Sequence, residues 1–153
     1  MTLAELLRHH GSVRPLVLQC GSKKLEGTHR VDALYTGSYW STYRAAIRDR
    51  GRPFDRPVYV LSARYGLAPI DARIASYDAV LADRPRKPNE VAVASILPLL
   101  VRQRARVGDE VDMVGSALYA EALTQAGFSV HRLTPPGAGI GYMLQALRAH
   151  LLS

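Results

Sequence analysis

The sequence predicts a three-layer α/β/α fold, in which a four-stranded parallel sheet lies between helices. Two observations carry this prediction: short apolar runs alternate with longer segments of helical spacing, and the runs are typical of strands buried on both faces. The apolar runs fall at residues 16–18, 58–61, 111–114 and 130–133, and the helical segments fall at residues 39–50, 89–104, 117–125 and 142–152.

The ends of these elements carry residues that favour a change of chain direction. Gly66 follows the second strand at the distance of a tight turn, and Ser116 stands where it can cap the helix over residues 117–125. Glycines that end helices commonly adopt the left-handed conformation, which no other residue adopts as easily. The glycines expected in this role are Gly51, Gly108 and Gly127.

Length and composition predict one domain over residues 1–153 and a nucleic-acid partner. The chain is 48% apolar, with 20 Lys and Arg against 13 Asp and Glu, a net charge of +7. Such an excess favours a polyanion, although the same cations could serve only to keep the protein in solution.

Cys20 is the only cysteine, which excludes an intrachain disulfide and a multi-cysteine zinc site. The sequence shows neither a signal peptide nor an apolar run long enough to span a membrane, so we expect a cytoplasmic protein without a membrane partner.

The most informative stretch runs from the second strand to Asp78. After Ser62 the chain alternates hydroxyls, cations, rings and carboxylates, and ligands of open α/β sheets bind at the carboxyl ends of such strands. We therefore expect Ser62, Arg64 and Tyr65 to face a crevice, and Tyr77 and Asp78 to return to the same edge. These groups suit a planar, polar ligand.

The first strand ends in a second polar segment with a glycine and two cations. A glycine lets the backbone approach a ligand closely, and lysines can receive its negative charge. The glycine spacing of a phosphate-binding P-loop is absent, and an ordinary turn with solvated lysines is the alternative reading. The candidate substrate contacts of this segment are Gln19, Cys20, Gly21 and Lys23, and Lys24 is a candidate for contact with a DNA phosphate.

Four aromatic residues follow at the start of the predicted helix over residues 39–50. Rings can stack on nucleobases, but rings at helical spacing more often belong to the core. We expect Trp40 or Tyr43 to pack inside, which leaves Tyr35 or Tyr39 as the better site candidates.

Two further segments are candidates for phosphate contacts. Gly139 and Gly141 precede the last helix, whose amino end can receive a phosphate, and the proline-rich loop over residues 82–88 carries Arg84, Arg86 and Lys87. The histidines are scattered without the spacing of metal ligands, so we expect neither a metal nor a cofactor. His29 alone among them is kept as a site candidate.

Five ordered motifs resemble those of a widespread family of small bacterial and phage domains of uncharacterised function. The resemblance covers roughly residues 16 to 145 and includes C20-G-S-K-K24, A33-L-Y-T-G-S-Y39, L61-S-A-R-Y-G-L67, Y77-D78 and G139-I-G141. That family in turn resembles the uracil-DNA glycosylase-like superfamily, including accessory domains of archaeosine-forming enzymes and antiphage DNA glycosylases. The chain lacks the usual G-Q-D-P-Y-H and H-P-S-P motifs, so the aspartate and histidine of those enzymes are not carried over.

The resemblance implies a uracil-DNA glycosylase-like fold and a DNA glycosylase that acts on phage DNA with modified bases. Such an enzyme flips a base into a pocket, hydrolyses its N-glycosidic bond and leaves an abasic site, here as antiviral defence, with glucosylated hydroxymethylcytosine a plausible target. We expect Asp78 to supply the catalytic carboxylate, with Asp32 and Asp71 as weaker candidates; an N-cap or a salt bridge is the structural alternative for Asp78. We expect Tyr65 or Tyr77 to stack on the base, and hydrogen bonds to the base to come from Ser62, Arg64, Gln19 or Lys23.

Two other functions are consistent with the same residues. One is a non-catalytic module that binds a nucleotide or a modified nucleobase for a larger defence or modification system. The other is an enzyme that acts on free nucleosides or nucleotides.

Overall fold

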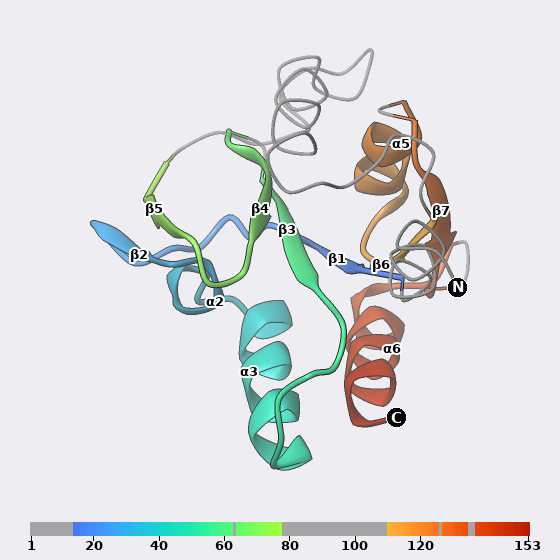
Figure 1. The fold of residues 1–153 in the computed structure, drawn as a ribbon, viewed down its shortest axis with the longest axis horizontal. Helices are drawn as coiled ribbons and strands as arrows, with labels where there is room; N and C mark the ends of the chain where they lie inside the picture. Colours follow the sequence, from blue (N-terminus) through green and yellow to red (C-terminus); the bar gives the residue numbers. More distant parts are fainter. Residues whose placement is uncertain (1–13, 63, 78–109, 126, 135–136) are drawn as a thin grey trace, which may run out of the picture.

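A computed structural model describes residues 14–62, 64–77, 110–125, 127–134 and 137–153. Its centre is a mixed five-stranded sheet in the order β4-β3-β1-β6-β7 (Figure 1). Four of these strands are parallel and fall where the sequence predicted them. Their bounds are Leu16–Gln19 for β1, Val58–Ser62 for β3, Glu110–Val114 for β6 and Ser129–Arg132 for β7.

Helices cover both faces of the sheet, as predicted. Helix α3 (Ser38–Arg50) and helix α6 (Ile140–Leu152) lie side by side on one face, and α5 (Ala117–Gln125) lies on the other (Figure 1). Gly51 and Gly127 take left-handed conformations with φ of 71° and 100°, which confirms them as helix-ending residues. The predicted helix over residues 89–104 and Gly108 lie outside the described residues.

The expectation of a sheet with four strands was wrong, because a fifth strand completes it. Strand β4 (Gly66–Pro69) pairs antiparallel with β3 at the sheet edge, directly after the turn at Gly66, whose φ is 75°. A segment that contains glycine and proline has low strand propensity, and an edge is where a sheet tolerates proline. Its position beside β3 therefore depends on the turn and not on its own composition.

Three short elements were also not predicted. Strands β2 (Thr28–Arg30) and β5 (Arg73–Ala75) pair antiparallel as a separate two-stranded ribbon, and α2 (Val31–Leu34) follows β2 directly. Segments of three or four residues are too short for a periodic pattern to be read from sequence. Pairing between distant parts of the chain creates them.

Strand β1 occupies the position at which the chain changes direction across the sheet. From β1 the chain passes through α3 to β3, and from β6 it passes through α5 to β7 on the opposite side. β1 and β6 are neighbours, with Leu18 paired to Val114 at their carboxyl ends. In doubly wound sheets a crevice opens at this topological switch point, and ligands bind there.

The indole of Trp40 links α3 to the end of β1. Trp40 is fully buried, and its Nε1 donates a hydrogen bond to the carbonyl of Gln19 at 3.1 Å. Its ring stacks with Tyr35 at 5.1 Å between centroids and meets Tyr43 edge-on at 5.3 Å. Aromatic pairs in these geometries contribute about 0.5–1.5 kcal/mol each beyond the burial of their area.

A buried carboxylate holds the opposite, amino end of the sheet together. Asp112 of β6 is 6% exposed and accepts a hydrogen bond from Arg56 at 2.7 Å, and Arg14 lies 3.5 Å away. Arg56 also contacts Nε2 of His150 on α6. Burial lowers the pKa of His150, and the nearby charge of Arg56 lowers it further.

This arrangement makes the free energy of unfolding depend on His150. Because the pKa of His150 is lower in the folded than in the unfolded chain, whose value is near 6.5, the unfolded chain takes up the proton first as the pH falls. We expect urea unfolding to show a stability that is full above about pH 6.5 and declines below it. The decline should be smaller in His150→Gln, and an identical pH profile in that variant would contradict the account.

A side chain at Gly115, which follows β6, would displace the side chain of Met113. An added Cβ would lie 2.6 Å from Cε of the fully buried Met113 and 3.2 Å from Oε1 of Gln19. We expect Gly115→Ala to lower the free energy of urea unfolding by about 1–3 kcal/mol through overpacking. The control is Gly141→Ala in the exposed first turn of α6, where nothing lies within 4 Å and the lower backbone entropy of alanine should give a gain of about 0.5–1 kcal/mol.

Candidate functional site

The carboxyl ends of β1, β3 and β6 bring together two predicted site residues and one residue that was predicted only as a helix cap. Gln19 ends β1, Ser62 ends β3, and Ser116 follows β6. The side chain of Gln19 crosses the switch point, where its Oε1 accepts a hydrogen bond from the backbone N–H of Ser116 at 2.9 Å. Gln19 is thereby held in one orientation at the centre of this edge.

Cys20 makes a second link across the switch point. Its Sγ lies 3.1 Å from the hydroxyl of Tyr119 on α5, and the residue is only 8% exposed. Tyr119 was not predicted as a site residue. The available signal was its place in the first turn of the helix that follows β6, since such a residue starts at the carboxyl edge of the sheet.

Two tyrosines from distant segments meet beside this link. The hydroxyls of Tyr35 and Tyr77 are 2.6 Å apart in the protein interior. The ring of Tyr77 also meets that of Tyr65 edge-on, with 5.5 Å between centroids. Burial, and next the proximity of Cys20, raises the pKa of both Tyr35 and Tyr77. The two phenols therefore stay neutral and keep their protons over the whole physiological range.

Ser62 turns the chain at the end of β3 and belongs to the same cluster. It is fully buried, and its Oγ accepts the backbone N–H groups of Arg64 at 3.2 Å and Tyr65 at 3.0 Å. Hydrogen bonding from Ser62 lowers the pKa of Tyr35 and of Tyr77, an effect smaller than that of burial. We call the side-chain groups of Gln19, Cys20, Tyr35, Ser62, Tyr77 and Tyr119 the edge cluster; Gln19 and Tyr119 are half-buried, and the other four are buried.

Cations lie at the rim of the edge cluster. The ammonium of Lys24 is 4.3 Å from the centroid of the Tyr77 ring, a cation–π geometry. The guanidinium of the exposed Arg64 is 5.5 Å from the Tyr65 ring, and Lys23 is exposed beside Lys24. The predicted lysines and Arg64 thus surround the rings, at a place where they can meet an anion.

Gly21 lies against the rings at the base of this rim. A Cβ at Gly21 would be 3.5 Å from Cδ1 of Tyr35 and 3.6 Å from Cδ1 of Trp40, which are ordinary contact distances. The described structure thus shows no steric need for glycine at this position.

The expected division among the four aromatic residues was half right. Trp40 and Tyr43 are packed, as predicted, but Tyr35 is also fully buried and Tyr39 is 7% exposed. The hydroxyl of Tyr39 donates to the carbonyl of Val114 at 2.6 Å, which satisfies it inside the protein. Neither Tyr35 nor Tyr39 offers an open face on which a base could stack, so the expectation of stacking at these two positions is corrected.

The remaining candidates are two glycines, one histidine and four residues that lie outside the described ranges. Gly139 is the N-cap of α6 and Gly141 lies in its first turn; both are exposed, and both follow β7, two strands from β1. The ring of His29 contacts the carbonyl of Glu26 at 2.6 Å, a local contact. The candidates that lie outside the described residues are Asp78, Arg84, Arg86 and Lys87.

A groove of about 850 Å³ lies away from the edge cluster, beside α3 and the start of β3. Asp32 and Asp71, the two weaker candidates for the acid, line this groove, and Asp32 is paired with Arg30 at 3.0 Å. None of the edge cluster lines it. We place the candidate site at the edge cluster because parallel sheets present their ligand sites at the carboxyl ends of strands.

The described part of the chain lacks two further features. No group of three or more His, Cys, Asp or Glu side chains is placed to hold a metal ion. Among the described helices, none has both the length and the apolar character needed to span a membrane.

Comparison with known proteins gives one match. The model of a family of unknown function, DUF6884, matches residues 16–149, which include all five motifs noted above. No curated protein and no solved structure matches the chain significantly.

The pair of buried hydroxyls in the edge cluster can be tested by a double-mutant cycle. Tyr35→Phe and Tyr77→Phe should each lower the free energy of urea unfolding by about 1 kcal/mol, because each leaves a buried hydroxyl with one partner fewer. The double variant should lose less than the sum, with a coupling on the order of 1 kcal/mol. Tyr142→Phe is the control, since Tyr142 is 65% exposed. Strictly additive losses would show that the two hydroxyls do not interact.

Proposed function

We propose that this chain, which belongs to the family of unknown function DUF6884, is a DNA glycosylase with a uracil-DNA glycosylase-like fold. It would hydrolyse the N-glycosidic bond of a modified base in DNA and leave an abasic site. The observation that carries the proposal is the edge cluster, in which neutral hydroxyls from three segments meet at the carboxyl edge beside Tyr77, the residue that precedes Asp78.

Neutral phenols suit the departure of a base. As the N-glycosidic bond breaks, negative charge gathers on the base, and hydrogen-bond donors in a dry site stabilise that charge. Tyr35 and Tyr77 keep their protons because burial raises the pKa of each. The hydroxyl of Ser62 accepts two backbone N–H groups and directs its own proton toward Tyr35 and Tyr77, so Ser62 supports the two phenols.

The sugar needs a carboxylate, and we assign this role to Asp78. Glycosidic bond cleavage develops an oxocarbenium ion, which a carboxylate stabilises directly or through an oriented water. Asp32 and Asp71 line the separate groove and are not members of the edge cluster. Asp78 follows Tyr77 directly in the chain, which supports it over both alternatives.

The positive charge favours a polymer over a free nucleotide as substrate. The net charge of +7 and the cations at the rim of the edge cluster match a chain of phosphates, of which a free nucleotide offers only a few. A glucosylated hydroxymethylcytosine in phage DNA, and with it a role in antiviral defence, follows from the resemblance of the motifs.

The second candidate is a module that binds a modified nucleobase without cleaving it. One observation favours it: the edge cluster consists of hydroxyls, a thiol and an amide, and none of its members is a carboxylate. The module and the glycosylase differ in whether Asp78 acts on the sugar.

Alkaline cleavage of treated DNA separates the two candidates. Phage DNA with glucosylated bases, incubated with the protein and then with alkali, should break at abasic sites, and unmodified DNA should stay intact. Asp78→Asn should lose this cleavage by a factor of at least about 100, the lower range for loss of an acid–base group, while its affinity for DNA is kept.

Asp71→Asn is the matched control, because Asp71 is an exposed aspartate that lines the groove. It should cleave as the unchanged protein does. DNA that stays intact across a panel of modified bases would exclude the glycosylase and leave the binding module. Equal cleavage by Asp78→Asn would remove Asp78 from the mechanism.

A further inference from the structure

The two-stranded ribbon of β2 and β5 stands apart from the main sheet. It projects on the side of β4, at the left of the molecule in Figure 1. Each strand shows the pattern exposed, half-buried, exposed, so His29 and Ile74 face the protein and the other four residues face outward. The outward residues are Thr28, Arg30, Arg73 and Ala75.

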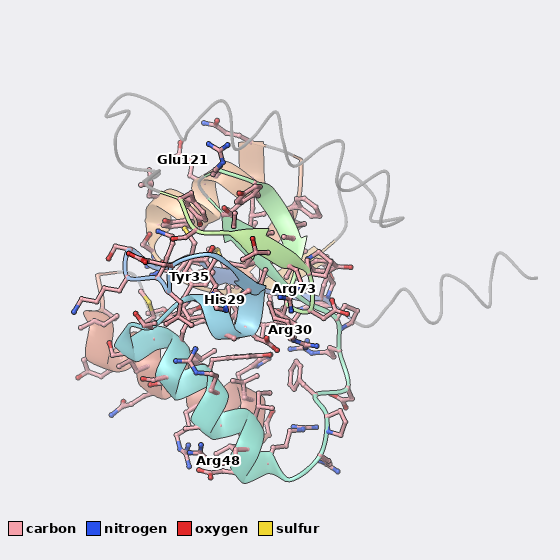
Figure 2. The ribbon with its side chains drawn as sticks, turned by 90° about the vertical axis from the view of Figure 1, so that its left-hand side faces the viewer. His29, Arg30, Tyr35, Arg48, Arg73 and Glu121 are labelled. Carbon is pink, nitrogen blue, oxygen red and sulfur yellow. The ribbon has the colours of Figure 1, made fainter. Side chains whose placement is uncertain are left out.

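The outward face of the ribbon brings two arginines together. Arg30 is directly opposite Arg73 in the ladder, and both lie on the face toward the viewer in Figure 2. Like charges directly opposite each other destabilise an antiparallel pair. Asp32 pairs with Arg30, whereas the side chain of Arg73 has, among the described residues, one long contact of 3.5 Å with the carbonyl of Thr28. Among the described residues, Arg73 therefore has no acidic partner for its charge.

Hydrogen bonds connect the ribbon to residues that adjoin the edge cluster. The hydroxyl of Tyr65 donates to the carbonyl of Ala75 at 3.2 Å, and the N–H of Ser76 donates to the carbonyl of Gly27 at 2.9 Å. Tyr77 comes next in the chain and lies under the ammonium of Lys24. The ribbon and the rim of the edge cluster are thus linked through the consecutive residues 75–77.

We propose that the ribbon binds the phosphate backbone of duplex DNA beside the base that enters the edge cluster. The chemistry fits, because the ribbon places two guanidinium groups directly opposite each other, and guanidinium groups pair well with the phosphates that line each DNA strand. Two-stranded ribbons are also an established means of contacting duplex DNA. The proposal rests on the proposed function for the role of the base, but the contact itself is measurable without any cleavage.

Arg73→Gln gives the direct test, because its removal breaks no ion pair among the described residues. The measurement is the affinity for a fluorescent duplex of ordinary bases as a function of salt. Each phosphate contact contributes about 0.9 to the slope of log affinity against log salt, so the slope should fall by about 0.9 in this variant. Arg73→Lys keeps the charge and should keep the slope.

Arg52→Gln is the matched control. Arg52 is exposed just beyond the end of α3, the helix that runs away from the ribbon in Figure 1. The slope of log affinity against log salt should therefore be unchanged in Arg52→Gln. The proposal would be overturned by an unchanged slope in Arg73→Gln or by an equal fall of the slope in Arg52→Gln. It would also be overturned if the protein bound a single strand more tightly than the duplex, or if the unchanged protein did not bind the duplex.

The failure of this proposal is distinguishable from the failure of the glycosylase proposal. A slope that depends on Arg73, together with modified DNA that stays intact, would keep the ribbon contact and exclude the glycosylase. Base release together with a salt slope that is the same in Arg73→Gln as in the unchanged protein would keep the glycosylase and exclude the ribbon contact.

Discussion

The double pairing of β1 is the constraint on which the rest of the structure depends. β1 is parallel to β3 on one side and to β6 on the other, so three strand ends that are far apart in sequence lie at one edge. The chain leaves β1 and β6 in opposite directions, which opens the switch point between them. Gln19 and Cys20 close that opening with hydrogen bonds to Ser116 and Tyr119. Without this pairing the members of the edge cluster would share no surface.

The two ends of the sheet are stabilised in different ways, and the difference suits their roles. At the amino end a buried ion pair between Asp112 and Arg56 holds β6, with His150 of α6 in contact. At the carboxyl edge the buried groups are hydroxyls and a thiol, from Tyr35, Tyr77, Ser62 and Cys20. Neutral hydroxyls cost less to bury than charges do, and they can exchange partners with a ligand. Hydrogen-bonding capacity is therefore placed where a ligand is expected.

Burial changes what the aromatic residues can contribute to the site. The ring of Tyr35 is stacked on Trp40, and its hydroxyl is paired with that of Tyr77, so it acts as a wall and a donor and not as a stacking platform. Tyr65 is only half-buried and carries Arg64 over its ring, which makes it the better candidate for contact with a base. The cations at the rim, Lys24 and Arg64, lie beside these rings.

The sequence by itself determined the parallel strands, the helices α3 and α5, most of α6 and the turn at Gly66, because each of these follows from a local pattern of apolar residues or from one glycine. It also placed Ser62 and Gln19 at the carboxyl edge, since both directly end apolar runs. Only the tertiary structure decided that Tyr35 is buried, that Tyr119 joins Cys20, and that Arg30 lies opposite Arg73. Those three facts depend on contacts between segments 40 or more residues apart, and no local pattern encodes such contacts.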